Sequence, residues 1–244
     1  MFNFGFKKVQ EEEKQKLVSS VFSSVSSKYD LMNNLMSFGI QKLWKRDLID
    51  FINIKEGGKY LDLACGTGDI AFLILEKAEK EGKNIHVTLC DENSEMLEIA
   101  KTRFANQNAS FVLSSAEELN FVENEFDGIF ISFGIRNFTN IEKALEKLRS
   151  CIKKGGSLFC LEFFSDVSRT LFFNKFYKFY LLTGIPNLGK LIVKDKEAYR
   201  YFGESILNFY SKKDFKNLLQ KSNFQFFSNL NSFLNIVGFF HFKK

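Results

Sequence analysis

The chain has 244 residues, of which 45% are hydrophobic and 26% are charged, a composition that allows a folded core and excludes the disordered class. Its formal net charge is +5, yet Arg and Lys form no cluster of the kind that follows phosphates, which argues against a nucleic-acid partner. The same mild excess of positive charge suits peripheral contact with anionic lipid.

The sequence predicts a location inside the cell. Its first residues show no apolar stretch followed by a small-residue cleavage site, and no uncharged apolar run reaches the length of a membrane span. The chain has no C-x-x-C pair. We therefore expect a cytoplasmic protein whose cysteines are reduced core thiols, at Cys65, Cys90, Cys151 and Cys160.

The first part of the chain is predicted to be helical, because apolar side chains recur on one helical face from Glu11 to about Ile54. From Lys59 onward, short apolar strands alternate with amphipathic helices, an arrangement typical of parallel strands joined by crossover helices. Strands are predicted at residues 59–64, 85–91, 109–114, 126–132 and 157–163, and helices at 69–80, 93–105 and 141–152.

The last third of the chain departs from this alternation. An aromatic and basic segment from about Asp166 to Leu191 is predicted to cap the sheet. Residues 199–223 are again predicted to be helical, and residues 224–242 resemble a terminal β-hairpin with Asn and Ser near its turn. A turn at Gly155-Gly156 is expected before the last strand of the alternating region.

A glycine-rich loop follows the first predicted strand. Gly66 and Gly68 lie between this strand and the next helix, where the absence of Cβ lets backbone N–H groups approach a ligand closely. The string GTGDIA also satisfies the dinucleotide pattern G-x-G-x-x-A, so a nicotinamide or flavin enzyme is a rival interpretation.

The charges around this loop favour a cationic ligand. Asp62 lies in the strand and Asp69 opens the helix, so they bracket the space where a dinucleotide places its pyrophosphate. A like-charge contact at ~4 Å costs about 4 kcal/mol before screening. S-adenosylmethionine brings a cationic amine and a sulfonium instead, which a carboxylate complements, so the sequence favours this methyl donor.

The next two strand ends supply further candidate contacts to the donor. Asp91 ends the second predicted strand, where a carboxylate can accept bonds from both ribose hydroxyls; the alternative is that it caps the helix that begins at Asn93 or Ser94. Ser115 and Ala116 follow the third strand and are placed to line the adenine pocket, although ordinary loop structure is an alternative.

The string SFGIRNF follows the fourth predicted strand. Ser132 ends the strand, and Gly134 is expected to allow a bend that presents Arg136 and Asn137 at the carboxyl edge of the sheet. A permanently charged guanidinium there suits stabilisation of a phenolate or orientation of a water. The alternative is a surface Arg paired with Glu142.

No metal site is predicted. The two histidines, His86 and His241, have no Cys, Asp or Glu at metal-ligand spacing.

Several strings together resemble one family, the demethylmenaquinone and ubiquinone C-methyltransferases. They are SVSSKYDLMNNLMSFGIQKLWKR, LDLACGTGD, DENSEML, AEEL, FDGIFISFGIRNF, KKGGSLFCLEF and YRYFGESI, in the family's order. The glycine loop is shared by many methyltransferases, whereas KYDLMNNLMSFG, SFGIRN and YRYFGESI are more specific. Ser115 departs from the Asn or Asp usual at its position.

The resemblance implies the fold and its parts. The fold class is α/β, a Rossmann-like class I methyltransferase with a mostly parallel seven-stranded sheet, helices on both faces, N-terminal helices and an aromatic cap. We expect one domain, residues 1–244, in four parts: an N-terminal helical lid (1–54), a core that binds S-adenosylmethionine (55–165), a cap and substrate region (166–205), and a C-terminal helix with its hairpin (206–244).

The resemblance also implies residue roles. Thr67, Asp91, the pair Ser115 and Ala116, and Ser132 match donor contacts of the family. Arg136 matches a residue thought to assist proton removal, and Tyr29 and Asp30 lie in a segment expected near the substrate, together with Asn137.

The implied reaction is C-methylation of a polyprenylated quinol, either demethylmenaquinol or 2-methoxy-6-polyprenyl-1,4-benzoquinol or both. The closest alternative is O- or N-methylation of another small molecule. An apolar channel for the tail is predicted between the N-terminal helices, around Met32, Leu35, Met36 and Phe38, and the segment from Phe172 to Leu182; ordinary core packing is the alternative there. A homodimer and a peripheral position at the inner face of the cytoplasmic membrane are further expectations.

Overall fold

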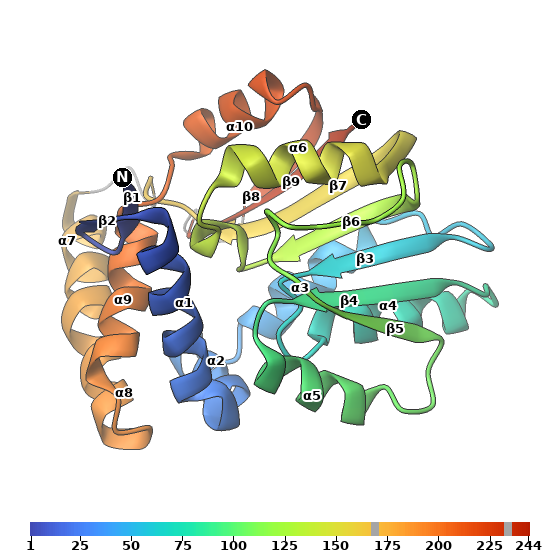
Figure 1. Cartoon of the computed structure of the whole chain (residues 1–244). Helices are drawn as coiled ribbons and strands as arrows, with labels where there is room; N and C mark the ends of the chain where they lie inside the picture. Colours follow the sequence, from blue (N-terminus) through green and yellow to red (C-terminus); the bar gives the residue numbers. More distant parts are fainter. Residues whose placement is uncertain (167–170, 232–235) are drawn as a thin grey trace.

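The computed structural model describes residues 1–166, 171–231 and 236–244. Its centre is a seven-stranded sheet in the order β5-β4-β3-β6-β7-β9-β8, in which only β9 runs against the others (Figure 1). The strands are β3 (Lys59–Leu63), β4 (His86–Asp91), β5 (Ala109–Leu113), β6 (Phe126–Ser132), β7 (Ile152–Phe163), β8 (Gln225–Asn231) and β9 (Val237–Lys243). The predicted strands and the mostly parallel seven-stranded sheet are confirmed.

Helices cover both faces of this sheet. Figure 1 shows α6 and α10 on one face and α3, α4 and α5 on the other. Their bounds are α3 (Gln41–Asp50), α4 (Asp69–Lys80), α5 (Ser94–Arg103), α6 (Ile141–Cys151) and α10 (Lys212–Lys221). Because both faces are buried, the inner strands are apolar almost throughout instead of alternating with polar residues.

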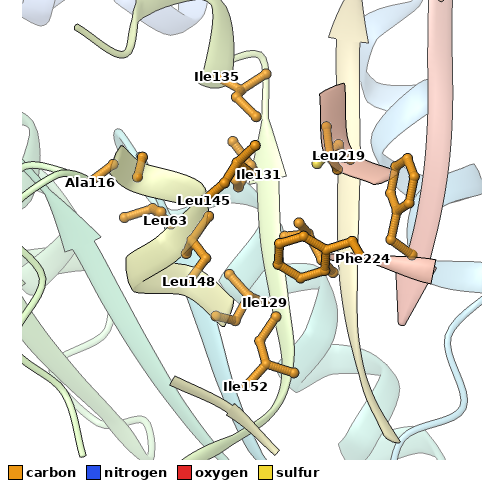
Figure 2. Close-up of a cluster of buried hydrophobic side chains, with 14 of the residues drawn as sticks. Leu63, Ala116, Ile129, Ile131, Ile135, Leu145, Leu148, Ile152, Leu219 and Phe224 are labelled. Carbon is orange, nitrogen blue, oxygen red and sulfur yellow. The ribbon is translucent and has the colours of Figure 1, made fainter. Parts of the chain in front are cut away.

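Strand β6 illustrates this arrangement. Ile129 and Ile131 pack against Leu145 and Leu148 of α6, in the cluster drawn in Figure 2, whereas Phe130 points to the other face and stacks on Phe159 with ring centroids 4.9 Å apart. All of these side chains but one are fully buried, and Phe159 is only 5% exposed. The two cores therefore fix β6 from both sides.

A group of helices gathers at the carboxyl ends of the strands, on the left in Figure 1. It comprises α1 (Glu11–Val25), a 3-10 turn (Ser26–Lys28), α2 (Tyr29–Met36), α7 (Leu171–Phe179), a π-helical turn (Tyr180–Gly184), α8 (Ile185–Ile192) and α9 (Lys196–Leu207). Met32, Leu181 and Ile206 belong to their shared core. The N-terminal helices and the aromatic segment thus pack on one another, although more than a hundred residues separate them in sequence.

Two local features differ from the sequence expectations, and a third cannot be compared. An N-terminal hairpin, β1 (Phe2–Phe4) and β2 (Lys7–Val9), was not predicted; it depends on a tertiary contact, since Phe4 stacks on Tyr201 at 4.2 Å. The turn expected at Gly155-Gly156 is an irregularity inside β7, which begins already at Ile152. The turn of the terminal hairpin lies outside the described residues.

The helical stretch predicted at residues 199–223 is two helices. The break lies between Leu207, the last residue of α9, and Lys212, the first residue of α10. Ser211 caps α10, because its Oγ accepts the Asp214 N–H at 3.1 Å. Ser211, which precedes the apolar pattern of α10, was the sequence signal for this break.

Two further sequence features can be compared with the structure. The four cysteines are free thiols, and Cys90, Cys151 and Cys160 are buried as predicted. Within the ranges that the structure describes, no helix is both long enough and apolar enough to cross a bilayer.

The packing of α6 on the sheet predicts the cost of a core truncation. Leu148 is fully buried, so Leu148→Ala should lower the free energy of unfolding by about 2–5 kcal/mol through lost burial and a residual cavity. Leu113→Ala, at a 60% exposed position on β5, is the matched control and should change it by less than about 0.5 kcal/mol. Urea unfolding measures both, and equal losses would contradict this packing.

Candidate active site

Two cavities adjoin at the carboxyl ends of β3 and β6. The narrow cavity, of about 70 Å³, lies beside Asp91 and Ser115 and is covered by α1 through Val18 and Phe22. The wide cavity, of about 430 Å³, lies between α2, α3 and the α7 segment. They share five lining residues: Tyr29, Ala64, Gly66, Ser132 and Phe133. Ligands in the two cavities therefore meet over the ends of β3 and β6.

The glycine loop after β3 has a left-handed backbone at three positions, Ala64 (φ 53°), Gly66 (φ 54°) and Gly68 (φ 86°). A Cβ at Gly68 would lie 2.6 Å from the ring of Phe104, so glycine is required there by conformation and by space. Gly66 lines both cavities, whereas Gly68 lines neither and serves the packing of α4.

Gly134 also has a different role from the predicted one. Its φ of −108° is accessible to any residue, but a Cβ there would lie 2.6 Å from the Cβ of Ala64. The left-handed residue of this loop is Phe133, with φ 58°. The close approach of the loops after β3 and β6 therefore requires glycine, and Phe133 makes the bend.

Asp91 is held at the end of β4 by backbone donors. The Gly66 N–H donates to its Oδ2 at 2.8 Å and the Asn93 N–H to its Oδ1 at 2.9 Å. Burial raises the pKa of Asp91, and these backbone N–H groups oppose the rise. The predicted alternative is wrong, since Asn93 itself caps α5 by accepting the Met96 N–H. Asp91 lines the narrow cavity with acceptor capacity left for a ligand.

Three buried polar atoms have no hydrogen-bond partner within the described part of the chain: Ser115 Oγ, Ser132 Oγ and Asn137 Nδ2. All three residues line the narrow cavity. Buried polar groups without partners are rare, because each costs about 1–3 kcal/mol. The hydroxyl, amino, carboxylate and adenine groups of S-adenosylmethionine can complete these bonds, so the residues present fit this cofactor.

The two acidic residues at the glycine loop differ in their surroundings. Asp69 forms ion pairs with Lys45 and Arg103, at 2.8 and 2.7 Å. Burial alone raises the pKa of Asp69, but these two cations outweigh it and bring the value to about 2. Its charge is thus balanced within the protein by two cations, which weakens the argument that Asp69 repels an anionic ligand.

Asp62 has no such ion pair. It is 1% exposed, accepts the Ala71 N–H at 2.9 Å and lines the wide cavity. Burial raises the pKa of Asp62 to about 7, although the Ala71 N–H opposes the rise. Both acidic residues line the wide cavity, but Asp62 is the one without an ion pair among the described residues, so its charge favours a cationic ligand more strongly.

The segment that carries Tyr29 and Asp30 reaches the glycine loop, as the resemblance implied. Tyr29 packs 3.8 Å from the position that a Cβ on Gly66 would take. The Thr67 hydroxyl donates to Asp30 Oδ1 at 3.2 Å. Thr67 is 5% exposed and lines the wide cavity. The start of α2 is therefore attached directly to the loop after β3.

Arg136 is buried in the wall of the wide cavity. Its Nη1 donates to Glu162 Oε1 at 2.7 Å and to the Phe133 carbonyl at 2.6 Å, and its Nε donates to Ser205 Oγ at 3.3 Å. Arg136 is 8% exposed and Glu162 is fully buried, so the predicted alternative of a surface pair with Glu142 is wrong.

The second guanidinium nitrogen of Arg136 is differently placed. No described residue accepts a hydrogen bond from Nη2, and Arg136 lines the wide cavity. The guanidinium carbon lies 5.2 Å from the centroid of the Phe202 ring and 5.7 Å from that of Phe163. The structure therefore fixes Nε and Nη1 by hydrogen bonds and leaves Nη2 without an acceptor among the described residues.

Several residues of the site had not been singled out from the sequence: Lys45, Glu162, Tyr201 and Ser205. Tyr201 donates to Asn137 Oδ1 at 3.0 Å, which orients this amide towards the narrow cavity. The signal for Glu162 was a charged residue inside an otherwise apolar predicted strand, since a buried carboxylate needs a cation. Tyr201 and Ser205 belong to the string YRYFGESI, whose helical pattern gave no sign of their partners.

The wide cavity is mostly apolar. Of the predicted channel residues, Met36 and Phe38 line it, Met32 is fully buried in the neighbouring core, and Leu35 is 41% exposed. The side chain of Phe172 lies outside the described residues. Further lining comes from Trp44, Phe133, Phe163, Phe173, Phe176, Tyr177, Tyr180, Leu181 and Ile185. No group of three or more His, Cys, Asp or Glu residues in the described ranges could hold a metal ion.

The buried ion pair predicts an asymmetric response to mutation. Glu162→Ala leaves the Arg136 guanidinium buried without its carboxylate and should lower the free energy of unfolding by about 3–5 kcal/mol. Glu142 is the residue that the sequence offered as an alternative partner of Arg136. Glu142→Ala should lower the free energy of unfolding by less than about 1 kcal/mol. Denaturant unfolding of both variants is the measurement, and a larger loss for Glu142→Ala would restore the surface pairing.

Comparison with known proteins identifies the family. The sequence profile described as the ubiE/COQ5 methyltransferase family matches residues 7–241. The ubiquinone/menaquinone biosynthesis C-methyltransferase UbiE of Rickettsia bellii (strain OSU 85-389) is 47% identical over 228 residues, which cover 91% of this chain and 90% of that protein. The protein of the same name from Haemophilus ducreyi is 41% identical and covers 97% of this chain and 91% of its own length.

Solved structures share the fold at low sequence identity. An SAM-dependent methyltransferase from Thermotoga maritima superposes with a TM-score of 0.62 at 17% identity and covers 93% of this chain and 99% of its own. An SAM-dependent methyltransferase from Aquifex aeolicus superposes with a TM-score of 0.57 at 15% identity. The match covers 96% of this chain and 98% of that protein. With the family match over nearly the whole length, the chain belongs to the ubiE/COQ5 methyltransferase family and is an S-adenosylmethionine-dependent methyltransferase.

Proposed function

We propose that this methyltransferase methylates a ring carbon of a polyprenylated quinol, either demethylmenaquinol or 2-methoxy-6-polyprenyl-1,4-benzoquinol or both. The names of the relatives from Rickettsia bellii and Haemophilus ducreyi support the reaction class. The observation that carries the proposal is an apolar cavity of about 430 Å³, within the usual range for small-molecule sites, that has the buried guanidinium of Arg136 in its wall.

The donor belongs in the narrow cavity and at its junction with the wide one. We assign Asp91 to the ribose hydroxyls, and Ser115 with Ala116 to the adenine. Asp62, Gly66 and Thr67 lie along the loop where the amino-acid part, which carries the cationic amine, would extend. Two observations support this assignment. The backbone hydrogen bonds that hold Asp91 leave lone pairs on its carboxylate for the ribose hydroxyls, and the buried Ser115 hydroxyl has no hydrogen-bond partner among the described residues.

When bound, S-adenosylmethionine supplies an electrophilic methyl group. The protein positions the two reactants. We assign Ser132 and Tyr29 to the place where the narrow and wide cavities meet, because each of these residues lines both cavities. Holding the two reactants in contact converts a bimolecular reaction into a unimolecular one. Burial raises the pKa of Tyr29, so its hydroxyl stays protonated at neutral pH and donates a hydrogen bond instead of removing a proton.

We assign Arg136 to the quinol oxygen. A phenolic hydroxyl with a pKa near 10 must pass its proton to a water before the ring carbon becomes strongly nucleophilic, and an apolar cavity raises that pKa further. The Nη2 of Arg136, which has no acceptor among the described residues, is the donor that we assign to the resulting oxyanion. Glu162 accepts from Nη1 and so acts as a positioning residue.

The reaction is tested with isotopically labelled donor and the two quinols in turn. We expect mass analysis to show a labelled methyl group on a ring carbon of at least one of them. Arg136→Lys should keep donor affinity but reduce turnover by about 100-fold or more, because a compact ammonium cannot reproduce the fixed guanidinium edge. Label on oxygen or nitrogen would instead indicate the O- or N-methylating alternative, and no transfer to either quinol would refute the substrate class.

The raised pKa of Asp62 predicts a pH dependence of donor binding. A cationic donor prefers the ionised carboxylate, so binding lowers the pKa of Asp62 below its free value of about 7. Affinity should therefore fall by up to about tenfold per pH unit as pH is lowered from 7. Above about pH 7.5 the amine of the donor itself loses its proton, which also changes the affinity. The affinity should therefore be measured below this pH.

Isothermal titration over this pH range is the measurement. Asp62→Asn should bind more weakly with little pH dependence, because its amide does not titrate. The matched control is Asp50→Asn, at an exposed position, which should keep the slope of the unmodified protein. A slope that persists in Asp62→Asn would assign the titrating group elsewhere.

A further inference from the structure

Large apolar side chains are exposed where the wide cavity opens to solvent. Phe38 is 80% exposed and Phe176 is 60% exposed, although both line the cavity. Further exposed apolar residues lie within one or two helical turns of them. We define the apolar rim as these six side chains: Leu35, Phe38, Leu43, Phe176, Phe179 and Leu182.

The two halves of the apolar rim are joined by direct contacts. The Tyr180 ring lies against the Phe38 ring with centroids 6.3 Å apart, and the Tyr180 hydroxyl donates to the Met36 carbonyl at 2.8 Å. These contacts tie the end of α2 to the turn that follows α7. The rim is therefore one surface built from two distant parts of the sequence.

Charge around the rim is mainly basic. Residues 31–46 contain three basic residues and no acidic one, and the same is true of residues 171–192. Lys45 is paired with Asp69, but Lys42, Lys175 and Lys178 are exposed beside the rim. Asp30 and Asp47 flank the first segment and are also exposed, so positive charge predominates around the rim without being the sole sign.

We propose that the apolar rim and its lysines dock on a bilayer that contains anionic lipid, with the mouth of the wide cavity facing the membrane. Exposed aromatic and leucine side chains enter the boundary between headgroups and acyl chains, while lysines remain at the phosphates. A soluble monomer rarely exposes contiguous apolar surface without a partner, and a predominance of positive charge favours an anionic partner. Docking on the membrane does not depend on the identity of the substrate. The delivery of a prenylated quinol from the membrane does rest on the proposed function.

The consequence for the substrate is a path that avoids water. A prenyl tail enters the cavity between Phe38 and Phe176 directly from the acyl layer, so its hydrophobic surface is never exposed. Turnover of a long-tailed quinol therefore depends on the rim, whereas turnover of a short-tailed, water-soluble quinol does not.

Sedimentation with vesicles tests the docking. We expect binding to vesicles of phosphatidylglycerol mixed with phosphatidylcholine, and much weaker binding to phosphatidylcholine alone. Leu43→Ser combined with Phe179→Ser should weaken binding by about tenfold or more, since neither residue lines the cavity and each loses its burial in lipid. Lys175→Glu combined with Lys178→Glu should abolish the preference for phosphatidylglycerol.

The matched control is Leu113→Ser combined with Phe227→Ser, at sheet positions that are 60% and 58% exposed. This variant should bind vesicles like the unmodified protein. Equal binding by the rim variant and the control would overturn the proposal, as would a homodimer that Leu43→Ser with Phe179→Ser dissociates, because the rim would then be covered by a second copy. Vesicle binding without methylation of any quinol would refute the proposed function and leave the docking intact.

Discussion

The active site depends on the point in the sheet where the connections from β3 lead away to either side. From β3 the chain moves outward through β4 to β5, then returns to place β6 on the other side of β3, so no crossover covers the space between the ends of these two strands. Both strand ends turn through left-handed residues, Ala64 and Phe133, and Gly134 lets the two loops touch. The two cavities, the donor contacts and the buried Arg136 are all arranged around this point.

The electrostatics of the site follow from pairing more than from the number of charges. Asp69, Asp62 and Asp91 all lie at strand ends or helix starts near the glycine loop, yet each has a different environment. Asp69 has two cations, Asp91 has backbone donors, and Asp62 has one backbone donor and a cavity. The carboxylate that remains responsive to a ligand is therefore the one with the least internal compensation.

Features with a local cause could be predicted from the sequence. The five parallel strands, the glycine loop and the position of Asp91 follow from short apolar runs, glycine spacing and strand ends. The hairpin β1–β2 could not be predicted, because Phe4 is ordered by Tyr201, which lies almost two hundred residues away. The break before α10 had a local signal in Ser211 that the continuous helical periodicity concealed.

The same distinction applies to site residues. Asp62 was identified from its charge beside the glycine loop, Gly66 from the loop's spacing, and Ser132 from the resemblance to the family. Lys45 looks ordinary in its own segment, and Glu162 stands out only as a charge inside an apolar strand; the tertiary structure alone shows that Glu162 compensates Arg136 and that Lys45 compensates Asp69. For the same reason the sequence could not distinguish a buried guanidinium from a surface one, nor show that Asp69 is neutralised.

The covering of the narrow cavity by α1 has a kinetic consequence. Side-chain bonds from Asn93 to Ser23 and from Ser26 to Glu95 join this helical arm to the sheet, each worth about 1 kcal/mol, whereas the strands beneath are locked by two apolar cores. Exchange of one cosubstrate molecule for the next in the narrow cavity would require α1 to move relative to the sheet. The barrier to such a motion would also include the buried side chains of Val18 and Val25 and the hydrogen bond from Lys14 Nζ to the Phe138 carbonyl.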